Sequence, residues 1–157
     1  MKAASLSELK KELIRLSPTQ VLDYCMHLAK YKKENKELLT YLLFEADDEH
    51  SYIRNVKEQM DEMFIEVNHR NLYFAKKNIR KILRTANKYI KFSGSKQTEV
   101  ELLIYFCKKL KGSGIKMNLS TALSNIYDRQ IQKANTSLAK MHEDLQYDYL
   151  EELKSLT

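Results

Sequence analysis

The stretch LYFAKKNIRKILRTANKYI, residues 72–90, carries apolar side chains at the three- and four-residue spacing of a helix face. These residues are Leu72, Ala75, Ile79, Ile82, Leu83, Ala86 and Ile90. At ~100° per residue they share one side of a helix, while most of the Lys and Arg side chains project from the opposite side. The stretch therefore predicts a long amphipathic helix at the protein surface.

Apolar stripes of the same kind recur along the chain. They run from Leu6, Val21, Leu38, Ile53 and Leu119 onward. Residues 98–111 are apolar on more than one side, so we expect the most buried helix there. Only three Gly and one Pro interrupt 157 residues, which leaves few positions for turns. The sequence predicts an all-α fold of seven or eight antiparallel helices, as a bundle or a short α-α superhelix, in a single domain over 1–157.

Helix ends are marked by capping residues. Ser17 and Pro18 fit the N-cap and first helical positions, because proline lacks the amide that this position leaves unused. The acids of 47–49 suit a helix start, and Gly112-Ser113-Gly114 suits a helix end. A break near 135–137 is expected to divide the C-terminal helical region. Val21, Leu22, Cys25, Leu28 and Ala29 are expected to face inward from the second helix.

Neither cysteine shows the spacing of a catalytic or metal site. Cys25 and Cys107 lie in apolar segments and are predicted to be buried thiols. Glu66 and His69 have the Glu-x-x-His spacing of di-iron bundles, but such a site needs a second copy of the motif. The sequence favours a protein that is not an enzyme, with no cofactor and no metal ion.

Apolar runs are short and interrupted by charges. Lys2, Lys10, Lys11 and Glu12 exclude a secretory segment at the start, and no run approaches the ~18 apolar residues of a membrane span. We expect a cytoplasmic protein without a membrane partner. The sequence leaves its oligomeric state open.

Charge is distributed unevenly along the chain. Between Arg70 and Lys116 there are 13 Lys and Arg but only two acids, Glu99 and Glu101, which gives +11. The rest of the chain holds 14 basic and 19 acidic residues, which gives −5. A strongly basic segment of this kind attracts acidic partners.

The basic residues of this segment form the candidate binding surface. They are Lys77, Arg80, Lys81, Arg84, Lys88 and Lys91 on the helix 72–91, extended by Lys108, Lys109, Lys111 and Lys116. Tyr73 and Phe74 point toward the same side. Three interpretations stay open: a solvated face balanced by acidic neighbours, a contact for an acidic protein, and a surface that follows nucleic-acid phosphates.

Several segments resemble an uncharacterised bacterial all-helical family known only as a domain of unknown function. The resemblance runs through residues 9–13, 17–22, 75–77, 102–106 and 122–127. It implies a helical fold over most of the chain, and it implies no activity and no site residue.

The sequence therefore favours a non-enzymatic helical interaction or scaffold module with an unidentified protein partner. A groove between stacked helical hairpins is the usual binding surface of such folds. The alternative is nucleic-acid backbone binding through the basic face of the helix 72–91.

Overall fold

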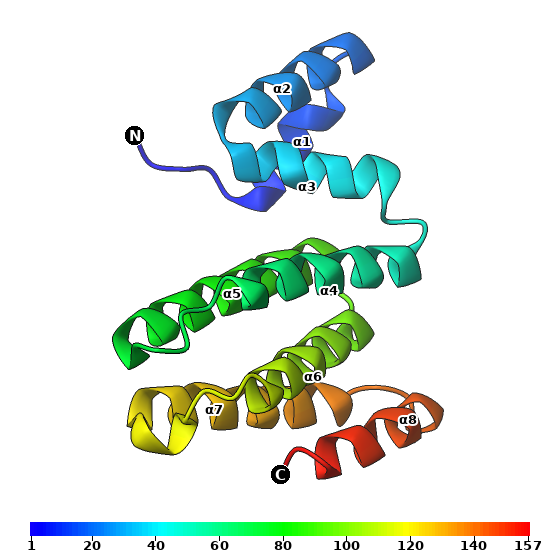
Figure 1. Ribbon diagram of the computed structural model, residues 1–157. Coiled ribbons are helices and arrows are strands. Elements are labelled where there is room, and N and C mark those ends of the chain that lie inside the picture. The colour runs from blue at the N-terminus through cyan, green and yellow to red at the C-terminus, as the bar shows by residue number, and fades with distance from the viewer. The chain divides into compact units, whose positions relative to one another are not determined.

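The computed structural model describes all 157 residues and contains eight α-helices, one 3₁₀ turn and no strand (Figure 1). The helices are α1 (Leu6–Ile14), α2 (Pro18–Tyr31), α3 (Lys33–Phe44), α4 (Glu49–Ile65), α5 (Leu72–Ser93), α6 (Lys96–Gly112), α7 (Thr121–Leu138) and α8 (Glu143–Lys154), with η1 (Met117–Leu119) before α7. Helices make up 79% of the chain, so the predicted all-α fold is confirmed. None of them is both long and apolar enough to cross a membrane.

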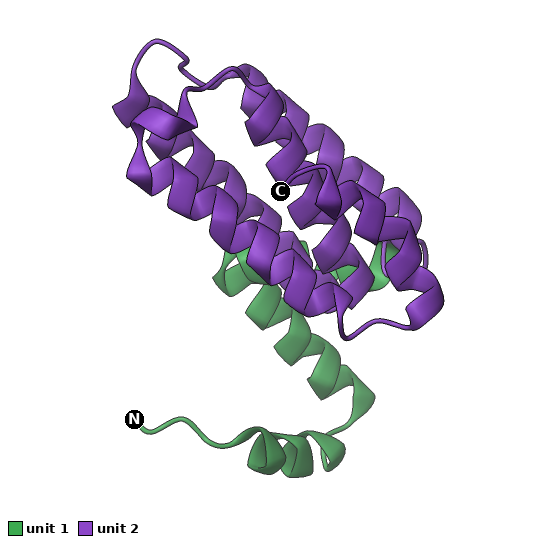
Figure 2. Cartoon of the chain, turned by 90° about the horizontal axis from the view of Figure 1, so that it is seen from below, with its two compact units in different colours: residues 1–44 green, residues 45–157 purple.

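The chain divides into two compact units (Figure 2). The first unit, residues 1–44, holds α1 to α3, and the second unit, residues 45–157, holds α4 to α8. The expectation of a single domain over 1–157 stays a prediction.

The first two helices of the first unit begin at capping serines, and Ser17 is the predicted one. Ser5 and Ser17 cap α1 and α2, each in a reciprocal capping box with the residue three positions later. Pro18 takes the first helical position of α2, as predicted. The Asn35 side chain of α3 donates a hydrogen bond to the carbonyl of Leu28 at 2.8 Å, which joins the ends of the α2–α3 hairpin.

Few side chains of the first unit are buried. Tyr41 is the only buried residue among 1–44. The prediction that the second helix faces inward is wrong for Leu22, Cys25 and Leu28, which are all exposed. The physical reason is size, because three short helices within ~40 residues cannot enclose an interior for every apolar stripe they carry.

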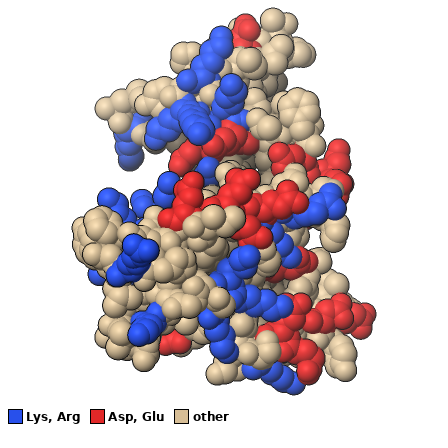
Figure 3. Space-filling model, viewed as in Figure 1, with Lys and Arg blue, Asp and Glu red and all other residues tan.

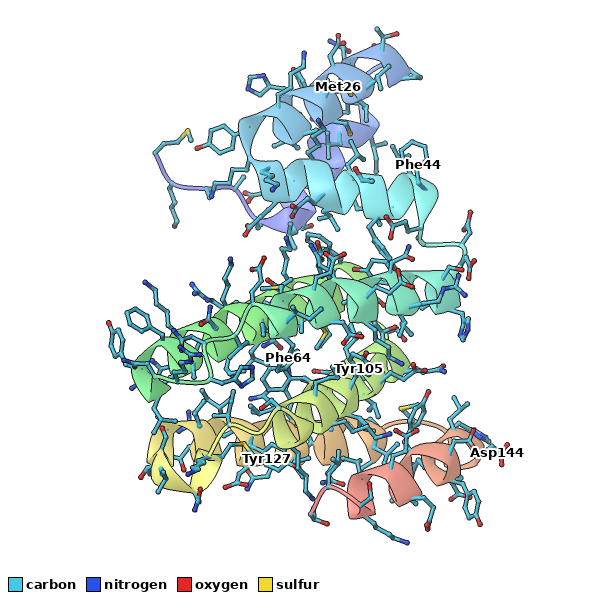
Figure 4. All side chains as sticks on the ribbon, viewed as in Figure 1. Met26, Phe44, Phe64, Tyr105, Tyr127 and Asp144 are labelled. Atoms are coloured by element: carbon cyan, nitrogen blue, oxygen red, sulfur yellow. The ribbon has the colours of Figure 1, made fainter.

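In the second unit α6 lies between two helical hairpins. It contacts α4 and α5 on one side and α7 and α8 on the other (Figure 1). The fully buried residues of α6 are Thr98, Val100, Leu102, Leu103, Phe106, Cys107 and Leu110. The prediction that residues 98–111 form the most buried helix is therefore confirmed. Phe64 of α4, labelled in Figure 4, packs against Phe106 with ring centroids 6.0 Å apart.

Polar side chains determine where the helices of the second unit end. Asp48 caps α4 as predicted, and the Glu49 carboxylate accepts hydrogen bonds from Ser93 and Thr98 at the α5–α6 connection. Gly94 has φ of 68°, a left-handed conformation that suits glycine and ends α5. Gly114, at φ 76°, has the same left-handed conformation in the turn that follows α6.

The predicted break at 135–137 is wrong in position, because α7 continues to Leu138 and the break follows at 139–142. Asn135 and Thr136 bond back to the carbonyls of Ile131 and Gln132 within the helix. Side chains that often favour turns are thereby satisfied inside α7.

Truncation of the α6 core should destabilise the protein strongly. Phe106→Ala removes a fully buried ring, and we expect a loss of about 3–5 kcal/mol in the free energy of unfolding, measured by urea denaturation. Ile65→Ala is the matched control at the exposed end of α4, where the change should stay within about 0.5 kcal/mol. Equal losses in the two variants would contradict the central position of α6.

Candidate functional site

One face of α5 is exposed to solvent because the other face is buried. The Asn71 side chain caps the helix by accepting hydrogen bonds from the amides of Tyr73 at 2.9 Å and Phe74 at 3.3 Å. The face made of Ala75, Ile79, Ile82, Ala86 and Ile90 is buried in the second unit. Because these residues occupy one side of the helix, the opposite side must face water.

That opposite side carries the α5 stripe, which we define as Lys77, Arg80, Lys81, Arg84, Lys88 and Lys91. All except Lys88 are exposed, and none of the five exposed cations forms an ion pair. Lys88 is half-buried, with its Nζ 4.6 Å from the centroid of the Tyr89 ring. The predicted arrangement of these residues on one helix face is therefore present.

The start of the stripe combines cations with aromatic rings. A shallow hollow of about 300 Å³ is lined by Tyr73, Lys76, Lys77, Arg80 and Arg84. The exposed rings of Tyr73 and Phe74 meet edge to face, with centroids 5.4 Å apart. Lys76 lies 5.9 Å from the Tyr73 ring. This end of α5 offers both positive charge and an aromatic surface to a ligand.

The lysines near the end of α6 have partners within the second unit. Lys108 pairs with Glu152 of α8 at 2.6 Å, and Lys109 pairs with Asp61 of α4 at 2.8 Å. Lys111 donates to two backbone carbonyls that follow α8, each at 3.2 Å. Lys116, just before η1, is exposed and forms no ion pair. Of these four predicted surface residues, three thus hold α6 to its neighbours.

A second hollow, of about 290 Å³, contains paired charges between α4, α6 and α8. Glu101 binds Lys57 at 3.0 Å and accepts the Tyr149 hydroxyl at 2.6 Å. Although burial opposes it, these hydrogen bonds hold the pKa of Glu101 below its usual value. Burial and a hydrogen bond to Asp61 raise the pKa of Tyr105 to about 12. Because these charged groups are paired with one another, the cluster stabilises the packing of α4, α6 and α8.

Glu99 is a buried carboxylate at the α6–α7 contact. It binds Lys96 at 2.7 Å and Lys133 at 3.2 Å, and it accepts the Ser137 hydroxyl at 2.7 Å. Burial disfavours the charge, but these hydrogen bonds more than compensate and lower the pKa of Glu99. The ionised form is therefore part of the folded structure.

Neutralisation of Glu99 should remove a pH-dependent part of the stability. A carboxyl whose pKa is lowered on folding stabilises above its unfolded pKa, and this contribution is lost as the pH falls through the folded pKa. We expect Glu99→Gln to lower the free energy of unfolding at pH 7 by about 1–3 kcal/mol. The difference from wild type should shrink below pH 4.5 in urea titrations. The exposed Glu143→Gln is the control, and an equal effect there would contradict the assignment.

The Glu66-x-x-His69 pair does not lie on a helix face. Glu66 is the C-cap of α4, and His69 lies in the turn that follows. The acidic stretch at 47–49 provides the cap of α4 and the Glu49 contacts described above. No three His, Cys, Asp or Glu side chains are grouped as metal ligands.

The two cysteines differ in environment. Cys107 is fully buried, as predicted, and burial together with the charge of Asp128 raises the pKa of its thiol to about 12. The same prediction is wrong for Cys25, which is exposed on α2. The reason is the lack of an interior in the first unit.

A thiol reagent should distinguish them. We expect one thiol per folded chain to react with Ellman's reagent at pH 8, because Cys107 is buried and protonated there. Cys25→Ser should abolish this reaction, and guanidinium should restore one reactive thiol in that variant. Rapid labelling of folded Cys25→Ser would contradict the burial of Cys107.

The first unit has an apolar groove between α2 and α3 that the sequence pattern did not predict. It has a volume of about 540 Å³ and is lined by Met26, Ala29, Lys30, Lys32, Lys33, Lys36, Leu39, Thr40, Leu43 and Phe44. Periodicity placed these aliphatic residues on helix faces but did not say which faces would stay open. The only feature of the sequence that could have indicated a binding surface here is the cluster of four lysines among these residues.

No family model, curated protein or solved structure matches this chain. The resemblance to an uncharacterised bacterial family therefore stays a prediction.

Proposed function

We propose that this chain is a non-enzymatic helical interaction module that binds the phosphate backbone of a nucleic acid through the α5 stripe. The main observation in support is the group of five exposed cations on one face of α5 that have no ion-pair partner. By contrast, Lys108 and Lys109 of the same basic segment are paired with acids of neighbouring helices. The stripe keeps its charge available for an external anion.

The length and spacing of the stripe suit a polyanion. Lys77 and Lys91 are 14 positions apart, so the stripe runs roughly 21 Å along the helix. Cations recur about once per turn over that length. A duplex of similar length carries roughly a dozen phosphate charges, and contact with them releases condensed counterions.

Aromatic side chains add a second attraction at one end. Tyr73 and Phe74 are exposed beside the hollow that Lys76, Lys77 and Arg80 help to form. Unpaired bases stack on exposed aromatic rings, and each stacked base contributes about 1–3 kcal/mol. This end of α5 therefore favours a ligand that offers both phosphates and bases.

A protein partner with an acidic face is the second candidate, since it would also be attracted by the stripe. Protein interfaces usually have an apolar or aromatic centre inside a polar rim. Between Lys77 and Lys91 no large apolar side chain is exposed. The α5 surface thus fits nucleic acid better than it fits a protein.

Charge reversal on α5 should abolish the binding. We expect a fluorescent single-stranded oligonucleotide to bind wild type at low salt, with affinity falling steeply as salt rises because about five phosphates are neutralised. The combined variant Lys77→Glu, Lys81→Glu, Arg84→Glu and Lys91→Glu should show no binding in fluorescence anisotropy.

The control variant reverses Lys10, Lys11, Arg129 and Lys140, which lie outside the stripe. Both variants lower the net charge from +6 to −2. The control should therefore retain more affinity than the α5 variant. Equal losses would assign the binding to net charge, and no binding by wild type at low salt would refute the proposal.

A further inference from the structure

The groove of the first unit has an apolar floor built by two helices. Met26 and Ala29 contribute from α2, and Leu39, Leu43 and Phe44 contribute from α3. Met26 and Phe44 are labelled in Figure 4. Met26, Leu43 and Phe44 are exposed by 45%, 64% and 80% of their surface. Open apolar surface of this kind is costly in water, and in folded proteins it marks interaction sites.

The rim of the groove is basic. Lys30, Lys32, Lys33 and Lys36 line it, and no acidic residue does. Only one of these lysines forms an ion pair: the Lys33 Nζ lies 3.8 Å from a carboxylate oxygen of Glu37, and the Lys33 side chain is largely exposed. Figure 3 shows basic side chains gathered over the first unit. An occupant must therefore be apolar toward the floor and negative toward the rim.

Charge argues against a second copy of this chain as the occupant. A symmetric contact would place the same surface on both sides, so the rim lysines of one copy would face those of the other. Like charges brought together at an interface cost several kcal/mol. The groove is thus better suited to a different, acidic molecule.

The shape of the groove suits a helix. The α3 residues that line it, 33, 36, 39, 40, 43 and 44, follow the spacing of one helix face. They extend over roughly 17 Å, and the α2 residues 26, 29 and 30 run along the other side. Two packed helices leave between them a depression in which the ridge of a third helix fits.

We propose that the α2–α3 groove is a docking site for an amphipathic helix of a partner protein, one with Asp or Glu flanking its apolar face. Apolar residues of the partner at positions i, i+3, i+4 and i+7 cover the floor. Its carboxylates meet the rim lysines. This surface is separate from the α5 stripe, and the proposal does not depend on nucleic-acid binding.

The test uses two designed peptides of about 18 residues, a length at which helices form in water. Both carry leucines at the four anchor spacings, and they differ only in having Glu or Lys at the flanking positions. We expect the acidic peptide to bind the full-length chain about tenfold or more tightly than the basic peptide in fluorescence anisotropy.

Two groove variants should distinguish the contribution of the apolar floor to peptide binding from that of the basic rim. The double variant Leu43→Ser and Phe44→Ser should weaken the acidic peptide about tenfold. The triple variant Lys30→Glu, Lys33→Glu and Lys36→Glu should reverse the preference in favour of the basic peptide. All five positions are exposed, so folding should be retained, as circular dichroism would verify. Ile65→Ser, an exposed residue outside the groove, is the matched control.

Four outcomes would overturn the proposal. One is no saturable binding of either peptide, and another is equal binding of both. A third is acidic-peptide binding that the groove variants leave unchanged but the α5 reversal removes, which would assign the peptide to the α5 stripe. The fourth is a dimer in sedimentation equilibrium that is lost in the Leu43→Ser, Phe44→Ser variant, because a second copy would then cover the groove.

Discussion

The second unit depends on the burial of α6 between the α4–α5 and α7–α8 hairpins. A helix enclosed on both sides must satisfy every polar group it carries, because an unpaired buried charge costs several kcal/mol. Glu99 meets this requirement by contacting α7, and Glu101 does so by contacting α4 and α8. Tyr105 does so by donating a hydrogen bond to Asp61 of α4. No buried side-chain nitrogen or oxygen is left without a hydrogen bond. The polar groups of α6 therefore have partners in the helices on both of its sides.

This requirement also explains which charges remain for binding. Asp61 and Glu152 are paired with the lysines near the end of α6. Figure 3 shows acidic side chains gathered over α4, yet none of them forms an ion pair with an exposed cation of the α5 stripe. The basic segment between Arg70 and Lys116 is consequently neutralised at α6 and left open at α5. That difference carries the proposed function.

The two units differ in how much of their apolar side-chain surface they bury. The second unit covers its stripes by packing five helices around a common interior. The first unit contains three short helices and leaves Leu43, Phe44 and much of α2 exposed. A small helical segment with open apolar surface usually gains stability from a partner. The basic rim of the groove narrows the chemistry of that partner to an acidic one.

The sequence by itself determined the helices and their caps, because periodicity and capping are local properties of the chain. It predicted the amphipathic α5, the central α6 and the starts at Ser17 and Asp48. Only the tertiary structure decided which faces are covered: Cys25 and Cys107 have similar apolar neighbours in sequence, yet one is exposed and the other buried. Likewise, Lys108 and Lys77 both appear as basic surface residues, but only packing brings Glu152 to Lys108. Such pairings join residues about 40 positions apart, and no local pattern records them.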